Sequence, residues 1–430
     1  MYRRAILIVT ILIIAIAATA HVEPVSHYTF DELHGSARVY PAPERRVQLP
    51  DTLTPVMINH LGRHGARYET SPKRVKSLRA SLIDARQKGM LTALGDSMLE
   101  IVERAYAMSR DKWGMLDSTG MSEQQGIAER IYEAWPTLVK GARIESISSY
   151  VPRCIMSMDE FTHRLAVLDN DVEILSSSGR MNSSLLRPFA IDSAYLNLRR
   201  DAPWSKELKE FYKNNVPLEP VWRLIDKRVM DEEKAREFAI PMFGFLCGLN
   251  ASGMKGDFLE KFYTYDEAYR MWECRNLMQY LERTASVYSA IPSEITCPLL
   301  ADIINTTDDF LAGRSKASLS LRFGHAETIM PFLSLIKLQD CYYAGKNMND
   351  VGQHWQNFHV TPMASNFQMI VCMSTSGTPY VRIDLNERPI LFPGTDCYYV
   401  TWEYARRYFD NILNSSPLIP GTSTNQQGVS

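Results

Sequence analysis

The sequence predicts an α/β fold, in which helices sandwich a mainly parallel β-sheet and a helical lobe is inserted into the chain. Short apolar runs of strand length, such as residues 55–58 and 317–323, end in turns that contain glycine. Segments with helical spacing lie between such runs, and this alternation is typical of a parallel sheet. Residues 196–308 are mainly helical in pattern. We therefore expect a core of residues 21–195 and 309–417, with residues 196–308 as a helical lobe over the carboxyl ends of the strands.

Periodicity and turn residues predict the individual helices and strands. Apolar residues at three- and four-residue intervals indicate the helices, and apolar–polar alternation indicates a strand at residues 144–150. The turn at 116–120 supplies a cap for the helix that follows it. The expected helices are residues 71–85, 91–112, 124–138 and 328–338, and the expected strands are residues 55–58, 144–150, 172–175, 317–323, 367–373 and 381–387.

The N-terminus has the pattern of a secretory signal peptide. Two arginines precede an apolar stretch at residues 5–18, and Ala-Thr-Ala at 18–20 has the small-x-small form of a cleavage site. The apolar stretch is short for a membrane span, so we expect residues 1–20 to be removed after Ala20. The mature protein would then be secreted or periplasmic and not inserted in a membrane. The polar, turn-rich residues 418–430 are expected to be a flexible tail.

Composition narrows the classes of partner and cofactor. Removal of the signal peptide leaves 45 basic and 49 acidic residues, a formal net charge of −4, and this balance argues against nucleic acid as a partner. A polyanionic ligand would therefore need a local basic patch. The oligomeric state is left open.

The chain has seven cysteines, none of which lies in the signal peptide. An exported protein can form disulfides, and an odd number leaves at least one thiol unpaired in a monomer. Cys247 and Cys274, both in the helical segment, are the pair that we favour. The cysteine spacings resemble no zinc site, so neither a metal nor another cofactor is expected.

The most informative motif is the pentapeptide at 63–67. It follows the apolar run at 55–58 and the polar pair Asn59 and His60. The carboxyl end of such a strand is where sites form in α/β folds. Arg63 and Arg67 flank His64, and guanidinium groups match the geometry of phosphate oxygens. A neutral imidazole between them could attack phosphorus, and Gly65 would let the backbone approach the anion closely. The alternative is a strand end with ordinary surface arginines.

This pentapeptide resembles the RHGxR signature of the histidine acid phosphatases. A second motif, residues 325–327, lies 261 residues further along and resembles the HAE variant of the multiple inositol polyphosphate phosphatases. The resemblance extends from about residue 57 to residue 393 and is loose across the helical lobe. It implies a phosphoglycerate mutase-like fold and a phosphomonoesterase that works through a phosphohistidine.

Carried onto this chain, the resemblance also implies roles for particular residues. His64 would be the nucleophile, and Glu327 would protonate the departing alkoxide and later activate water. Alternatively, Glu327 is a carboxylate that stabilises the first turn of a helix, and Arg153 is a helix-capping or salt-bridging arginine. The implied phosphate-binding residues are Arg63, Arg67, Arg153 and His325.

Two departures from the wider family bear on the substrate. Glu327 follows His325 by two residues, whereas much of the family has an aspartate directly after this histidine, and this favours the inositol polyphosphate branch. Glu69 stands where the RHGxRxP form of the motif has proline. This departure affects the expected path of the loop, whereas both arginines and the histidine of the motif are present. A basic cluster follows the motif and could meet the outer phosphates of a substrate, or could be a solvated face. Its members are Lys73, Arg74, Lys76 and Arg79.

We therefore expect a secreted phosphomonoesterase that hydrolyses myo-inositol hexakisphosphate (phytate) and lower inositol polyphosphates. Its partners would be small-molecule phosphate esters. One alternative is a broad-specificity acid phosphatase acting on sugar phosphates and other small monoesters. Another is a phosphate-ester binding protein without activity.

Overall fold

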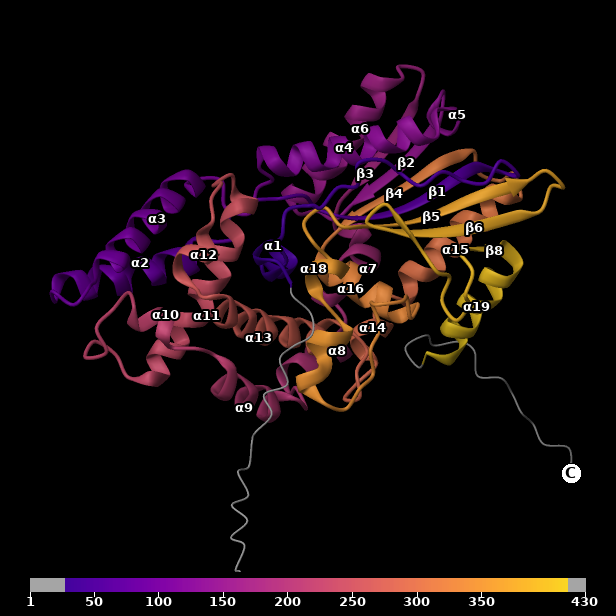
Figure 1. Ribbon diagram of the computed structural model, residues 1–430. Helices are drawn as coiled ribbons and strands as arrows, with labels where there is room; N and C mark the ends of the chain where they lie inside the picture. Colours follow the sequence, from indigo (N-terminus) through magenta and orange to yellow (C-terminus); the bar gives the residue numbers. More distant parts are fainter. Residues whose placement is uncertain (1–27, 417–430) are drawn as a thin grey trace, which may run out of the picture.

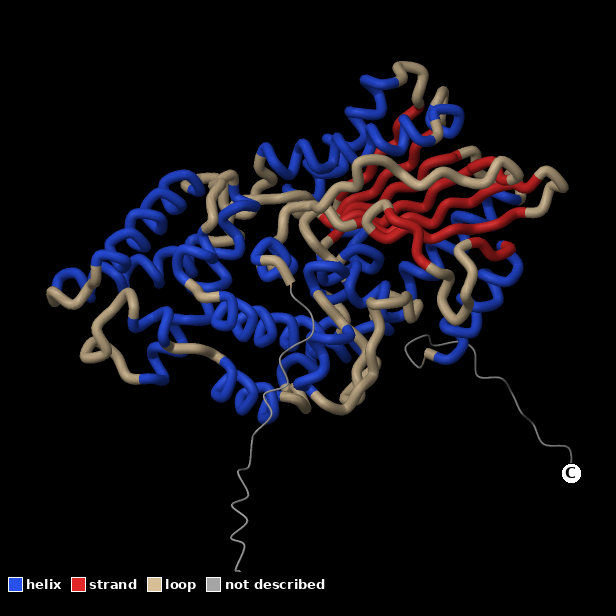
Figure 2. Tube along the Cα trace, in the orientation of Figure 1, coloured by secondary structure: helices blue, strands red, loops and turns tan. Residues whose placement is uncertain are grey.

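A mixed sheet of eight strands forms the centre of the computed structural model, which describes residues 28–416 (Figure 1, Figure 2). The strands are β1 (Leu53–Arg63), β2 (Arg143–Ser148), β3 (Glu173–Ser178), β4 (Ala317–Gly324), β5 (Asn366–Ser374), β6 (Pro379–Leu385), β7 (Arg388–Ile390) and β8 (Tyr399–Thr401). Their spatial order is β3–β2–β4–β1–β5–β6–β7, and β8 also pairs with β6.

The sheet is mainly parallel, as expected, and has an antiparallel side that was not anticipated. Strands β1 to β4 are parallel to one another, whereas β5 is antiparallel to β1. Strand β6 is antiparallel to β5 and so returns to the direction of β1, while β7 and β8 oppose it. Five of the eight strands therefore run the same way.

Helices cover both faces of the sheet (Figure 2). On one face, α4 (Ser118–Ala134), α5 (Pro136–Val139) and α6 (Pro152–Leu168) pack through residues such as Ile131 and Phe161 onto Ile58 and Leu321 of the strands. The other face is covered by α7 (Ser183–Leu186), α15 (Cys297–Leu311), α16 (Ala326–Leu335) and α19 (Trp402–Ser415). These two apolar layers make the sandwich that the sequence predicted.

A second group of helices extends to one side of the sheet (Figure 1). It contains α2 (Pro72–Gln87) and α3 (Ala93–Ser109), then α8 (Ser193–Arg200), α9 (Ser205–Asn215), α10 (Glu219–Trp222), α11 (Glu232–Leu249), α12 (Phe258–Phe262) and α13 (Tyr265–Arg283). The division into a core and a lobe at residues 196–308 remains our proposal, although α15, most of which lies in that range, packs on the sheet. Helix α2 packs against α11, so α2 and α3 lie with the lobe although they precede it in the chain.

Short helices complete the described chain. They are α1 (Phe30–Leu33), α14 (Ile291–Glu294), α17 (Val351–His354), α18 (Asn357–Val360), and the 3₁₀ turns η1 (Gly35–Ala37), η2 (Arg180–Asn182), η3 (Pro188–Ala190), η4 (Asn250–Ser252) and η5 (Met348–Asp350). Between residues 28 and 416 no helix is both long and apolar enough to cross a bilayer. The expected signal peptide and flexible tail lie outside the described residues.

The expected disulfide between Cys247 and Cys274 is wrong, because both cysteines are free and buried. They lie on different helices, α11 and α13. The Cys247 thiol faces the carbonyl of Leu33, 3.9 Å away, whereas the main chain of Cys274 accepts a hydrogen bond from Tyr212 of α9. All seven cysteines are free thiols in the structure.

The pairing of β1 with β4 brings the two sequence motifs together. In the parallel register Arg63 lies opposite Gly324, and both strands end at the same edge of the sheet. His64 and His325 are the next residues of each strand, and the backbone N–H of His64 donates to the Gly324 carbonyl at 3.1 Å. Two segments that are far apart in sequence therefore form one site.

Helix α4 holds the loop that follows β1. Asp117 caps this helix, as predicted, by accepting the Gly120 N–H at 2.8 Å, and its own N–H donates to the Ala66 carbonyl at 3.1 Å. A Cβ on Gly65 would lie 2.5 Å from the Gly120 carbonyl oxygen, and one on Gly120 would lie 2.1 Å from the Ala66 carbonyl oxygen. Gly65 is therefore required for close contact with α4, rather than only for approach to an anion.

This contact predicts that Gly120→Ala destabilises the protein. The new methyl group must displace backbone, and overpacking of this kind costs about 1–3 kcal/mol of unfolding free energy. The matched control is Gly126→Ala on the same helix, where a Cβ would approach only the end of the Arg130 side chain, at 3.0 Å. Alanine favours a helix interior by about 1 kcal/mol, so this control should be neutral or stabilising. Urea unfolding measures both, and equal losses would contradict the proposed contact.

Candidate active site

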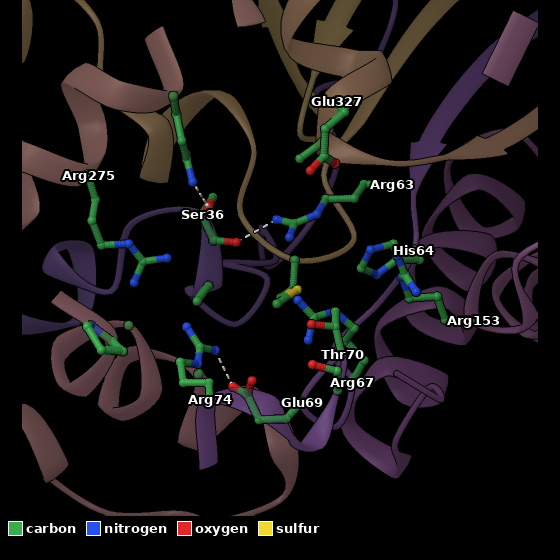
Figure 3. Close-up of a pocket in the computed structure, with 18 of the residues that line it drawn as sticks. Ser36, Arg63, His64, Arg67, Glu69, Thr70, Arg74, Arg153, Arg275 and Glu327 are labelled. Atoms are coloured by element: carbon green, nitrogen blue, oxygen red, sulfur yellow. Dashed lines mark hydrogen bonds and ion pairs between the residues drawn. The ribbon is translucent and has the colours of Figure 1, made fainter. Parts of the chain in front are cut away.

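A cavity of about 560 Å³ lies where the loop after β1 meets the helical group (Figure 3). Its volume is within the range of small-molecule sites. Five of the six residues that the sequence placed in catalysis or phosphate binding line it, and these are Arg63, His64, Arg67, Arg153 and Glu327. The sixth, His325, lies directly behind the wall, with its ring centroid 5.6 Å from that of His64.

His64 is held as a neutral imidazole in one tautomer. Its Nδ1 lies 2.9 Å from the Gly65 carbonyl oxygen. Because a carbonyl oxygen can only accept, Nδ1 must carry the proton, and the lone pair is on Nε2. The side chain is 3% exposed, and burial, followed by the charges of Arg153 and Arg63, lowers its pKa well below the usual value. This imidazole is able to act as a nucleophile.

The arginines around His64 are crowded and only partly compensated. Nη1 of Arg63 donates to the carbonyls of Ser36 and Thr361, at 2.5 and 2.7 Å, and Nη1 of Arg67 donates to the Tyr68 carbonyl at 2.9 Å. Burial, and then the neighbouring arginine charge, lowers the pKa of Arg63 to about 9 and that of Arg67 to about 10. An anion in the cavity would relieve this repulsion.

His325 is the N-cap residue of α16 and is 1% exposed. Nη2 of Arg153 lies 3.4 Å from its Nδ1, and Nη1 of Arg187 lies 3.3 Å from its Nε2. Burial, followed by the charge of Arg153, lowers the pKa of His325 to about 3. Arg153 lies in the first turn of α6, beside this ring and in the cavity wall, rather than serving as a helix cap.

Glu327 lies in the first turn of α16 and forms an ion pair with Arg283 of α13, with 2.8 Å between Oε1 and Nη2. Burial by itself would raise the pKa of this carboxyl group. The charge of Arg283 is the largest of the effects that together outweigh burial, and the pKa of Glu327 is lowered to about 2. The group is therefore a carboxylate in the free protein at any ordinary pH.

The basic cluster after the motif divides between the cavity and the surface. Lys73 and Arg74 line the cavity, and Arg74 pairs with the buried Glu69. Lys76 is exposed on α2 and is not among the lining residues, and Arg79 pairs with Glu103 at 2.8 Å. Figure 3 shows Arg74 and Arg275 on the side of the cavity opposite His64.

Sequence reasoning missed three arginines of this site. Arg275 and Arg283 line the cavity from α13, and Arg187 reaches His325 from the segment between α7 and η3. The two arginines on α13 are eight residues apart, slightly more than two helical turns, and this spacing could have indicated a basic stripe. No periodic pattern marks Arg187, because only tertiary packing brings it to His325.

Among residues 28–416 no group of three or more histidine, cysteine, aspartate or glutamate side chains is arranged to hold a metal ion. The expectation that the site works without a metal or another cofactor stays a prediction.

Known proteins resemble the chain in sequence and in fold. No protein-family model matches the chain. Human multiple inositol polyphosphate phosphatase 1 is 24% identical over 400 residues, which cover 85% of this chain and 81% of that protein.

Solved structures share the fold. The multiple inositol polyphosphate phosphatase of Bifidobacterium longum, in complex with inositol hexasulfate, matches with a TM-score of 0.74 and 19% identity, over 86% of this chain and 96% of that one. The phytase of D. castellii matches with a TM-score of 0.69 and 15% identity, over 90% and 86% of the two chains. The chain is therefore a homologue of the multiple inositol polyphosphate phosphatases, with the fold that these enzymes share with phytases of the histidine acid phosphatase family.

Proposed function

We propose that this protein is a phosphomonoesterase that hydrolyses inositol hexakisphosphate and lower inositol polyphosphates through a phosphohistidine at His64. The observation that carries the proposal is the state of His64: a neutral imidazole with its lone pair on Nε2, surrounded by arginines in a cavity that also holds Glu327. Nucleophile, anion-binding groups and a carboxylate that can carry a proton are the parts that phosphoryl transfer needs. The relatives and structural neighbours named above support the substrate class.

In the first step, a phosphate group of the substrate is held by the guanidinium groups and His325. Nε2 of His64 attacks phosphorus, and the P–O bond to the inositol ring breaks with its electron pair on the departing oxygen. Glu327 gives that oxygen a proton. The guanidinium charges stabilise the equatorial oxygens as their charge increases. These guanidinium groups belong to Arg63, Arg67 and Arg153.

In the second step, the Glu327 carboxylate takes a proton from water while the water oxygen attacks phosphorus. The N–P bond breaks, its electron pair returns to Nε2 of His64, and inorganic phosphate leaves. The same carboxyl group thus acts first as an acid and then as a base.

Substrate binding must raise the pKa of Glu327 for the first step to occur. Its pKa is about 2 in the free protein, so the acid form is scarce there. A polyphosphorylated substrate places negative charge beside Arg283 and Glu327, and this charge favours the protonated carboxyl group. The proton-donating form is present below the pKa of Glu327 in the complex and is lost as the pH rises through it. Turnover of poor leaving groups should therefore be greatest at acid pH.

The role of Glu327 predicts a leaving-group effect for Glu327→Gln. Turnover of inositol phosphates should fall about 100-fold or more, because their alkoxides need a proton. Hydrolysis of p-nitrophenyl phosphate, whose leaving group is stable without one, should fall much less. Steady-state kcat/KM values on the two substrates measure this, because they report the steps up to the phosphohistidine and not its hydrolysis, and equal losses in kcat/KM would argue against Glu327 as the acid.

The far side of the cavity supports a polyphosphorylated substrate. Lys73, Arg74 and Arg275 line this side, and Nη1 of Arg275 is buried without a hydrogen-bond partner among the described residues. These positive charges lie beyond the reacting phosphate and suit further phosphates on the same ring. A substrate with a single phosphate would not meet them.

Lys73→Ala should therefore raise the KM for inositol hexakisphosphate by about twofold to fivefold, since exposed ion pairs contribute modestly. The KM for p-nitrophenyl phosphate should not change. The matched control is Lys76→Ala, an exposed lysine on the same helix outside the cavity wall. A similar change in both variants would show that only the general charge of α2 matters.

The proposed function is tested by phosphate release from inositol hexakisphosphate, with ion-exchange separation of the products and His64→Ala as the inactive control. A ladder of lower inositol phosphates, absent in the variant, is expected. Activity on p-nitrophenyl phosphate alone would indicate the broad-specificity acid phosphatase. Phosphate release that survives His64→Ala would overturn the phosphohistidine mechanism.

We also propose that the protein works outside the cytoplasm, as a secreted or periplasmic enzyme. The charged, apolar and small-x-small pattern of residues 1–20 supports export. Its ligands would be small phosphate esters, and the acidic balance of the mature chain argues against nucleic acid.

A further inference from the structure

A buried carboxylate that takes no part in the proposed reaction lies close to His64. Glu123, on α4, is 9% exposed. Its Oε2 accepts the backbone N–H of Ala66 at 2.7 Å, and its Oε1 accepts the backbone N–H of Tyr40 at 2.9 Å. Glu123 therefore joins the loop after β1 to the N-terminal segment.

The bond to Ala66 is connected to the imidazole. The N–H of Ala66 and the C=O of Gly65 belong to one peptide group, and that C=O accepts Nδ1–H of His64 at 2.9 Å. A continuous chain of hydrogen bonds thus runs from the carboxylate, across a peptide group, to His64. Hydrogen bonds in such chains polarise one another. A negative charge at the N–H end makes the carbonyl a stronger acceptor, which increases the electron density on Nε2.

The surroundings leave this charge without an ion-pair partner. Within the described residues no salt bridge involves Glu123, and the charges that act on it most are Asp117 of its own helix and Arg63. On α6, the neighbouring helix, Glu160 binds Gln125 and Arg164 binds Glu129 instead. The other packed segments, α5 and η4, contain no titratable side chain.

Keeping a carboxylate here is costly. Burial raises the pKa of Glu123 to about 7, although both backbone N–H groups and Arg63 favour its charged form. A neutral side chain could satisfy one N–H without that cost. The carboxylate instead satisfies both N–H groups, one with each oxygen.

We propose that Glu123 is a positioning residue for His64, acting through the Gly65–Ala66 peptide group to fix the imidazole tautomer and to strengthen Nε2 as a nucleophile. The same charge stabilises the positive ring that forms when Nε2 bonds to phosphorus. No proton moves along the chain, and Nδ1 keeps its hydrogen throughout. This inference rests on the proposed function, in which His64 attacks phosphorus.

The first test compares Glu123→Gln with Glu129→Gln, which removes a charge from the exposed side of the same helix. On p-nitrophenyl phosphate, Glu123→Gln should lower kcat about tenfold with little change in KM, since it weakens a charged hydrogen bond. The control should be unchanged.

The pH dependence separates this role from a purely structural one. Only the carboxylate form of Glu123 strengthens His64 as a nucleophile. Its effect on kcat is present above the Glu123 pKa of about 7 and is lost as the pH falls through that value. The ratio of the wild-type kcat to the Glu123→Gln kcat should therefore rise with pH through that region. The titration of Glu327 affects both enzymes alike and cancels in this ratio. A ratio that is independent of pH would overturn the proposal.

A second readout does not depend on activity. The Nδ1–H proton resonance of His64 in the wild-type protein should move as Glu123 titrates, and should not do so in Glu123→Gln. A resonance in the wild type that does not respond across this pH range would also overturn the proposal. If phosphate release survives His64→Ala, the proposed function fails instead, and the resonance still reports on the link to Glu123.

Discussion

Crowding of positive charge around one imidazole is the constraint on which this structure depends. The guanidinium groups of Arg63, Arg67 and Arg153 line a single cavity with His64. Burial lowers the pKa of each of these groups, and neighbouring arginine charge lowers it further, with Arg187 as the neighbour that acts on Arg153. Without an anion, backbone carbonyls of Ser36, Thr361 and Tyr68 compensate part of this charge. Such a site stays open only if the surrounding fold is rigid enough to prevent the arginines from moving apart.

The fold supplies that rigidity from both sides of the catalytic loop. Helix α4 presses on the loop at Gly65, and Glu123 ties it to Tyr40. The hydroxyl group of Tyr40 in turn donates to Glu387 at 2.9 Å. Glu387 and Asp384 are fully buried and bind three arginines, which are Arg46, Arg130 and Arg382. Removing one member of such a buried network is strongly destabilising, so it anchors the N-terminal segment that supplies Ser36 to the site.

The same electrostatics explains why the site suits a polyanion. Arg283 keeps Glu327 ionised in the free protein, yet the first step of the proposed mechanism needs this group protonated. Substrate charge resolves the conflict, because phosphates near Arg283 weaken its hold on the carboxylate. The cationic far wall at Lys73, Arg74 and Arg275 favours ligands that bring several negative charges. Substrate recognition and activation of the acid thus have a common origin.

The sequence by itself determined the features that depend on short-range pattern. A short apolar run located β1, the strand pattern at 317–323 located β4, the turn at 116–120 located the cap of α4, and the resemblance of two short motifs indicated residues that meet at the cavity. These features depend on a few neighbouring residues, whose backbone preferences are local.

Only the tertiary structure decided which side chains from distant segments meet at the site. It placed Lys73 in the cavity wall and Lys76 outside it, although both lie on α2, because the packing of that helix fixes which face is turned inward. It separated Cys247 from Cys274 and brought Arg187 to His325. The link from Glu123 to His64 likewise exists only because α4 packs on the loop, and contacts between distant segments leave no periodic signal in a single sequence.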